Sequence, residues 1–302
     1  MNLTTLAEVK LWLPQISNTS SDAILNSLIQ RCSSQILAYL NRPDISQKTF
    51  IDNFNGIPPS GELMIKNWPV LSVSAVSVNT YSVQKSSGQG QPGWTLETWD
   101  GSLPGQPQLI GIRGYNASYQ SGGYGSGSVG YDSAGLLTST RGSVYGSGFQ
   151  NVSVTYTAGY VVQAEAQTIP ATPYQVTPLQ PYGIWAADGG VTYTNGTALT
   201  AIASGTPTVG QYLPPQPWAT SPTSVYTFAA ADTAQGVLLT YSFIPFALDQ
   251  GCVEWVGERF KYRDRIGLKS QSLSGQESIA YQLGMPDAVK MMIDPYAKSF
   301  PL

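Results

Sequence analysis

The stretch that decides the fold is PFALDQGCVEWVGERFKYRDR, residues 245–265. Proline suits the first position of a helix, because its missing N–H would have no intrahelical partner there. Apolar side chains then recur at steps of three and four, at Leu248, Cys252, Trp255, Val256 and Phe260. This spacing predicts an amphipathic helix whose apolar stripe must be buried against another part of the chain.

The first forty residues offer helices of the same kind. Thr5 and Glu8 match a capping box, in which each side chain satisfies a free backbone N–H, and Pro14 ends this short helix. A second helix is predicted from apolar residues at helical spacing: Leu25, Leu28, Ile29, Cys32, Ile36 and Leu40. We therefore expect the two chain ends to form one small helical bundle.

The middle of the chain has the pattern of strands. Residues 70–78 and 152–160 alternate apolar side chains with serine or threonine, which is typical of a half-buried strand. Residues 161–243 hold further short strand-like runs and a tight-turn signal at Asn195-Gly196, as in a small sandwich. Residues 81–148 are rich in Gly, Ser and Tyr, and we interpret them as a projecting arm. The alternative for that segment is a linker without a role.

These patterns predict an α+β protein. A small helical bundle built from both chain ends, with short strands and a C-terminal tail, takes residues 1–80, 149–160 and 244–302. A long Gly/Tyr-rich arm or loop takes residues 81–148. An inserted β-sandwich-like domain takes residues 161–243.

The composition excludes several classes of function. The 302 residues carry 18 acidic and 15 basic side chains, a net charge of −3, so a global basic footprint for nucleic acid is lacking. Histidine, the commonest general base and zinc ligand, does not occur. We expect no enzyme, no cofactor and no metal. A hydrolase built on acids of the 161–243 segment is the alternative, since carboxylate pairs hydrolyse glycosidic bonds.

The two cysteines, Cys32 and Cys252, lie on the apolar faces of predicted helices. We favour buried free thiols in a reducing cytoplasm, because stapled secreted domains carry more cysteine; a disulfide between the two ends is the alternative. The N-terminal residues lack the pattern of a signal peptide, and no apolar run approaches the ~20 residues that span a bilayer.

Four stretches resemble the tailed-phage head–tail connector (adaptor) family. They are LTTLAEVKLWL at residues 3–13, the helix from Ser21-Asp22 to Leu40-Asn41-Arg42, VTYTAGY at residues 154–160, and the segment 244–267. In family members the Tyr-x-Ala-Gly-Tyr strand is followed closely by the Pro-initiated helix, whereas here residues 161–243 intervene. That segment is therefore interpreted as an insertion, and it is itself similar to β modules of other phage structural proteins.

The resemblance implies a structural virion protein of the particle neck, at the head–tail junction, assembled in the host cytoplasm. Neighbouring copies would form a dodecameric ring beneath the portal protein. The ring would extend the DNA channel, through which DNA passes without specific binding, and would bind the next neck or tail protein. A membrane is not among the implied partners.

Contact residues follow from this resemblance and from residue type. Residues expected to bind the portal or a neighbouring copy are Arg259, Lys261, Arg263, Arg265, Ile266, Leu268, Tyr281, Met285, Tyr296 and Phe300. Arm contacts are expected at Tyr115, Tyr119, Tyr124 and Tyr131. For the basic residues a purely structural explanation also suffices, because cations near a helix C-terminus complement the helix dipole.

A different function is the second possibility. The chain would then be a phage receptor-binding, glycan-binding or decoration protein that uses the β insert, with aromatic side chains against the sugar. This alternative depends on Trp94, Trp99, Trp185 and Trp218. Isolated tryptophans in small sandwiches more often belong to the core. The two possibilities differ in symmetry and position, because a connector is a closed ring present once per particle, whereas an adhesin is usually trimeric and peripheral.

Overall fold

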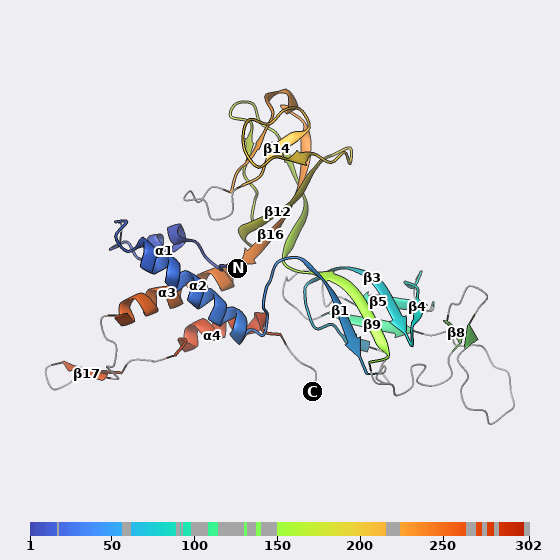
Figure 1. The fold of residues 1–302 in the computed structure, drawn as a ribbon, viewed down its shortest axis with the longest axis horizontal. Helices are drawn as coiled ribbons and strands as arrows, with labels where there is room; N and C mark the ends of the chain where they lie inside the picture. Colours follow the sequence, from blue (N-terminus) through green and yellow to red (C-terminus); the bar gives the residue numbers. More distant parts are fainter. Residues whose placement is uncertain are drawn as a thin grey trace. The chain divides into compact units, whose positions relative to one another are not determined.

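The computed structural model describes residues 1–16, 18–55, 62–88, 91, 93–97, 108–113, 130–131, 137–139, 150–215, 224–263, 270–273, 277–280 and 284–298. Within them the chain has four α-helices and several mostly antiparallel sheets, which confirms the α+β class. The chain divides into two compact units (Figure 1). We call Met1–Ser46 with Tyr160–Ala297 the helix-bearing unit, and Gln47–Gly159 with Lys298–Leu302 the sheet unit.

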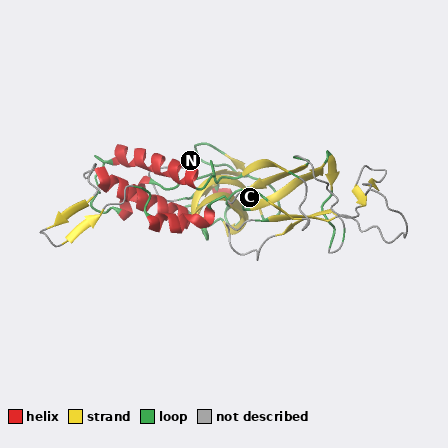
Figure 2. Ribbon diagram, turned by 90° about the horizontal axis from the view of Figure 1, so that it is seen from below, coloured by secondary structure: helices red, strands yellow, loops and turns green. Residues whose placement is uncertain are grey.

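The helices of the helix-bearing unit come from both ends of the chain and lie side by side (Figure 2). They are α1 (Leu6–Trp12), α2 (Asp22–Tyr39), α3 (Phe246–Tyr262) and α4 (Asp287–Ile293), which continues into the 3-10 turn Asp294–Tyr296. The Thr5 hydroxyl accepts a hydrogen bond from the Glu8 N–H at 3.2 Å, as the capping box predicts. Pro245 is the N-cap of α3, one position earlier than the sequence pattern indicates.

The helices pack through the predicted stripes. Leu25, Ile29 and Ile36 of α2 are fully or almost fully buried, as are Leu248 and Val256 of α3. Gly251 lets α3 approach α4 closely, since an added Cβ there would lie 2.9 Å from Ile293 Cγ2. At Gly257 an added Cβ would lie 3.7 Å from Trp12 Cδ1 of α1, an ordinary contact distance.

Strands between Tyr160 and α3 complete this unit, and we call residues 161–245 the insert. Its longer sheet has the order β10-β16-β12, with β10 at Val161–Thr168, β12 at Gly183–Tyr193 and β16 at Gly236–Pro245. Its smaller sheet has the order β11-β15-β14-β13, from Gln175–Val176, Tyr226–Phe228, Gln211–Leu213 and Thr200–Ala201. The insert joins α3 without a linker, because β16 ends at Pro245 and α3 begins at Phe246.

The sheet unit has its own apolar core. One sheet has the order β1-β9-β3-β4, from Lys48–Phe54, Val152–Ala158, Val70–Val78 and Tyr81–Val83. A second has the order β2-β6-β5, from Glu62–Met64, Leu109–Arg113 and Gly93–Glu97. Two further hairpins are described: β7 (Gly130–Tyr131) with β8 (Leu137–Ser139), and, in the helix-bearing unit, β17 (Ser270–Leu273) with β18 (Glu277–Ala280). The core of the sheet unit includes Ile65, Val76, Ile110, Val154 and Tyr156.

This division differs from the predicted one in two respects. The strands at 48–78 and 152–158, expected in the helical body, belong to the sheet unit instead. Part of the predicted arm 81–148 is also folded, since β5 and β6 contribute Trp94, Ile110 and Ile112 to the core of that unit. The high average content of Gly and Ser in this segment concealed two short apolar strands.

Candidate interaction surface

The last turns of α3 hold cations against aromatic rings of the same helix. The guanidinium carbon of Arg259 lies 5.6 Å from the ring centroid of Trp255 and 6.0 Å from that of Tyr262. The guanidinium carbon of Arg263 lies 4.4 Å from the ring centroid of Phe260. Each contact is within the range of a cation–π interaction. Both guanidinium groups therefore have aromatic contacts within their own helix.

Lys261 lies beside an exposed apolar surface. It is exposed and follows Gly257 by one helical turn on the same face of α3, and Gly257 is where Trp12 and Leu13 of α1 pack. Trp12 is 52% exposed and Leu11 is 73% exposed. We call Leu11, Trp12 and Lys261 the basic-apolar face. The sequence stripe of α1 gave no reason to single out Leu11 or Trp12, because their exposure depends on what α1 packs against.

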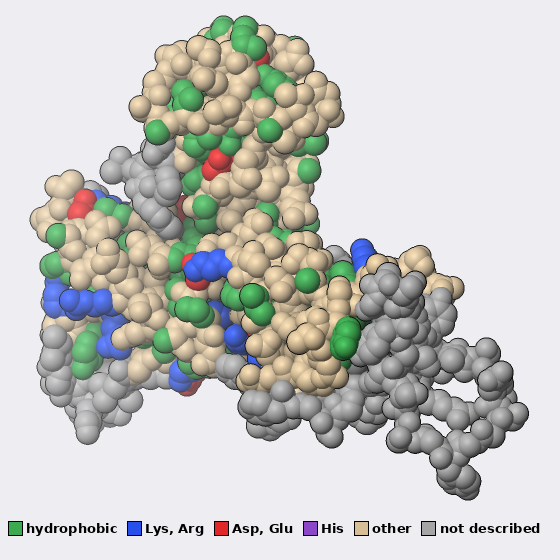
Figure 3. Space-filling model, turned by 45° about the vertical axis from the view of Figure 1, so that its right-hand side comes forward, with side chains coloured by type: hydrophobic (Ala, Val, Ile, Leu, Met, Phe, Trp, Pro, Cys, Tyr) green, Lys and Arg blue, Asp and Glu red, His purple; other side chains and the backbone are tan. Residues whose placement is uncertain are grey.

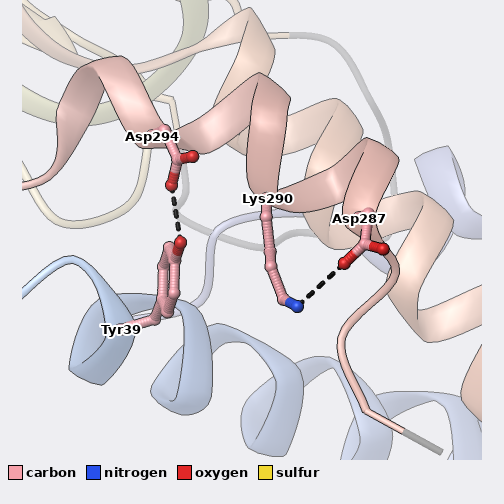
Figure 4. Close-up of polar contacts among 4 residues, drawn as sticks. All are labelled: Tyr39, Asp287, Lys290 and Asp294. Carbon is pink, nitrogen blue, oxygen red and sulfur yellow. Dashed lines mark hydrogen bonds and ion pairs between the residues drawn. The ribbon is translucent and has the colours of Figure 1, made fainter.

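The outer face of α4 has the opposite charge. Asp287, Met291 and Asp294 follow at positions i, i+4 and i+7 and so share one side of the helix. The Lys290 ammonium donates to Asp287 Oδ1 at 2.9 Å, and the Tyr39 hydroxyl of α2 donates to Asp294 Oδ1 at 2.6 Å (Figure 4). Met291 is 76% exposed. We call Tyr39, Asp287, Met291 and Asp294 the acidic-apolar face.

The hydrophobic core of the helix-bearing unit contains two free thiols. Cys32 and Cys252 are buried and unbridged, and the Ser33 hydroxyl lies 3.4 Å from Cys252 Sγ. Burial raises the pKa of the Cys32 thiol to about 11 and that of Cys252 to about 12. Both sulfurs therefore stay protonated at neutral pH and serve as small core side chains.

Asp249 is a buried carboxyl in the first turn of α3, with 8% of its surface exposed. Burial raises its pKa to about 6; the nearby Thr4 hydroxyl lowers it and the Glu8 carboxylate raises it. The helix N-terminus favours an acid at this place, whereas the surrounding apolar core disfavours its charge.

The insert uses its carboxylates internally. Asp188 accepts hydrogen bonds from the Tyr212 hydroxyl at 2.7 Å and from the Tyr226 hydroxyl at 3.0 Å. Glu165 accepts one from the Tyr241 hydroxyl at 2.6 Å. The sequence has no Lys or Arg from residue 142 to residue 258. On the face drawn in Figure 3 the upper lobe, which is the insert, accordingly shows no blue side chain.

The predicted contact residues are distributed unequally. Arg259, Lys261 and Arg263 lie together at the end of α3. Met285 and Tyr296 pack against the core of the helix-bearing unit, and the Tyr296 ring centroid lies 6.0 Å from that of Tyr160. Outside the described residues lie Arg265, Ile266, Leu268, Tyr281, Phe300, Tyr115, Tyr119 and Tyr124. Tyr131 belongs to β7, but its side chain is outside the description.

Two of the four tryptophans of the glycan-binding alternative are core residues. Trp94 and Trp185 are each 8% exposed, and Trp185 Nε1 donates to the Tyr226 hydroxyl at 3.1 Å. Trp99 and Trp218 lie outside the described residues. In the described part of the chain, no group of three or more His, Cys, Asp or Glu side chains is placed to hold a metal ion. None of the described helices has the length and apolar character needed to cross a membrane.

Comparison with known proteins agrees with the resemblance found in the sequence. Residues 3–92 match the family model described as phage gp6-like head-tail connector protein, which covers α1, α2 and β1 to β4. No curated protein matches the chain. The match supports a structural connector role in a phage particle. Over residues 3–92 the chain is thus similar to the phage gp6-like head-tail connector family, which confirms the resemblance for the first two of the four stretches.

Proposed function

We propose that this protein is the head–tail connector of a tailed phage and that it acts as a ring of about twelve copies beneath the portal, the stoichiometry implied by the family resemblance. The ring extends the DNA channel and joins the capsid to the next neck or tail protein. The observation that carries this proposal is the family match over residues 3–92. The segments from the C-terminal half pack on the matched helices and supply the basic end of α3.

The chemistry of the surface supports such an assembly. Only 11% of the residues are charged, below the roughly 25% of an ordinary soluble domain, so much of the surface can be covered at a low desolvation cost. The net charge of −3 suits a channel through which DNA must slide without being held. Closed heterologous contacts between identical subunits generate rings of this kind.

The basic end of α3 is proposed to act in assembly rather than in folding. Arg259, Lys261, Arg263 and Arg265 would pair with acidic groups on the portal or on a neighbouring copy. The segment beyond α3, including Ile266, Leu268, Tyr281 and Phe300, would contribute apolar contacts to the portal. The arm tyrosines Tyr115, Tyr119, Tyr124 and Tyr131 would add contacts to other neck components.

Native mass spectrometry and electron microscopy of the purified chain test this function. The chain should be measured alone and after mixing with portal-bearing capsids that lack a tail. We expect one closed ring at the portal vertex, and capsids without a portal are the matched control. Binding at many positions on the capsid, or as peripheral trimers, would instead favour the receptor-binding or decoration alternative.

A further inference from the structure

Each of the two faces includes exposed apolar side chains of the helices. Six large apolar side chains of α1 to α4 are exposed: Leu11, Trp12, Ile24, Tyr39, Phe246 and Met291. Two of them belong to the basic-apolar face and two to the acidic-apolar face. Exposed apolar groups that cluster beside charges are typical of protein contact sites, whereas scattered ones need no explanation.

The two faces point in different directions. α4 packs on α3 at Gly251 through Ile293, and α1 packs on α3 at Gly257 through Trp12. Six helical positions correspond to a rotation of about 240° around the axis of α3. Val289 and Ile293 of α4 are buried, and Met291 lies between them on the opposite side of the helix. A single copy can therefore present both faces at once, to two different neighbours.

The faces are complementary in charge and similar in construction. One has half-exposed Trp12 and exposed Leu11 beside the cation Lys261. The other has exposed Met291 and Tyr39 beside the carboxylates Asp287 and Asp294, of which Asp287 is ion-paired with Lys290. Trp12 has few rotatable bonds, and Met291 adapts its shape to an aromatic surface, so this pair of anchors suits a contact between proteins.

Figure 4 shows how the carboxylates are held before contact. Lys290 and Tyr39 orient Asp287 and Asp294 on the same side of α4, so their direction does not depend on a neighbour. A neighbouring cation would add a second partner to each carboxylate. Such charge-assisted contacts fix the register of an interface and weaken as salt rises.

We propose that the basic-apolar face of one copy docks on the acidic-apolar face of the next copy. Two different surfaces meet in this contact, so it is heterologous and repeats from copy to copy until a ring closes. The inference rests on the proposed connector function and adds the residues through which neighbouring subunits are joined. The contact places Trp12 against Met291 and pairs Lys261 with Asp294.

Charge reversal followed by rescue tests the pairing. Lys261→Glu alone and Asp294→Lys alone should each weaken subunit association at least about tenfold, because each places like charges opposite one another. The double variant carrying both changes should recover association. Arg31→Glu, an equal charge change at an exposed position of α2 outside both faces, is the matched control and should assemble normally. Circular dichroism and thermal melting establish that each variant is folded.

Mixing two blocked variants tests the heterologous geometry. Trp12→Ala/Lys261→Ala removes only the basic-apolar face, and Met291→Ala/Asp294→Asn removes only the acidic-apolar face. Each variant alone should stay monomeric. The mixture should yield one-to-one heterodimers and nothing larger, because each chain keeps one working face. Native mass spectrometry with one isotope-labelled chain distinguishes these species.

The outcomes separate this inference from the proposed function. If the wild type forms a ring at the portal vertex and the single charge reversals do so equally well, the inference is overturned and the connector function stands. If single reversals abolish the ring and the double variant stays monomeric, the pairing is also overturned. A folded wild type that assembles neither alone nor with portal-bearing capsids overturns the proposed function itself.

Discussion

The helical bundle and the insert place their charges in opposite ways. In the bundle, Lys261 and the carboxylates of Asp287 and Asp294 are at the surface, where a partner can reach them. In the insert, Glu165 and Asp188 accept hydrogen bonds from tyrosine hydroxyls of the same domain. The difference teaches that charged side chains are available to a partner in one region and bound within the domain in the other.

The largest expected loss of stability comes from a substitution at Gly183, where the insert meets the start of α3. A Cβ added at Gly183 would overlap the Ile244 backbone carbonyl, which cannot move without breaking the pairing of β12 with β16. We expect Gly183→Val to cost about 4 kcal/mol or more in free energy of unfolding. Gly251→Ala in the bundle meets only side-chain methyls of α4 and should cost about 1 kcal/mol. Urea denaturation measures both, and equal losses would contradict the comparison.

Removing one carboxylate from each region compares how much the two carboxylates contribute to stability. Asp188→Ala leaves the hydroxyls of two buried tyrosines, Tyr212 and Tyr226, without their acceptor and should destabilise the insert by about 2–4 kcal/mol. Asp294→Ala removes an exposed hydrogen bond from Tyr39 and should cost less than about 1 kcal/mol. Asp188→Asn keeps an acceptor and serves as the control. If Asp188→Ala proves no worse than Asp294→Ala, the carboxylates of the insert do not order it.

The two regions should also respond to pH in different windows. The folded pKa of Asp249 is raised to about 6, so the folded state prefers the protonated acid, and bundle stability falls as pH rises from about 4 to about 6. Asp249→Asn should therefore stabilise the bundle by about 2 kcal/mol at pH 7 and change little at pH 4. Thermal melting at both pH values measures this.

In the insert, burial and the neighbouring carboxylates raise the pKa of Tyr212, Tyr226 and Tyr241. These groups stabilise the fold while protonated, so the contribution is complete below pH ~10 and is lost as pH rises further. Replacing Tyr241 by Phe should reduce this loss of stability at alkaline pH.

For Asp249, the contradicting outcome is an Asp249→Asn variant whose stability relative to wild type is the same at pH 4 and pH 7. Such a result would contradict a raised pKa of Asp249 in the folded bundle.

The smallest effect on subunit association is expected from deleting most of the insert. We expect a chain that lacks residues 162–242, with the strand rejoined to the helix, to fold and still form oligomers, because both proposed faces belong to the helices. Native mass spectrometry against the full chain checks this. A soluble but strictly monomeric product would show that the insert takes part in subunit contacts.

Local patterns predicted the helices well and the division into units poorly. The stripes at Leu25, Ile29 and Ile36 and at Leu248 and Val256 fixed buried faces, because helical periodicity alone reveals them. Trp94 and Ile110 were hidden in a Gly- and Ser-rich segment, since strands of five residues leave little signal in an average over sixty.

The candidate surface was predictable only in part. The basic residues at the end of α3 are visible in the sequence, and the structure places Arg259, Lys261 and Arg263 together. The exposure of Trp12 and Met291 was not predictable, because apolar residues at helical spacing are expected inside until the packing partner is known. Tyr39 and Asp294 are separated by 255 positions, so only the fold brings them together.

The direct passage of β16 into α3 has a mechanical consequence. No loop residue separates the end of β16 at Pro245 from the start of α3 at Phe246. Phe243 on the same strand packs against Tyr160, with their ring centroids 5.8 Å apart. A force on the far end of the insert is therefore transmitted through β16 directly to α3. Lys261 lies near the other end of α3, so in the proposed ring a load on the insert would reach the contact between neighbouring copies.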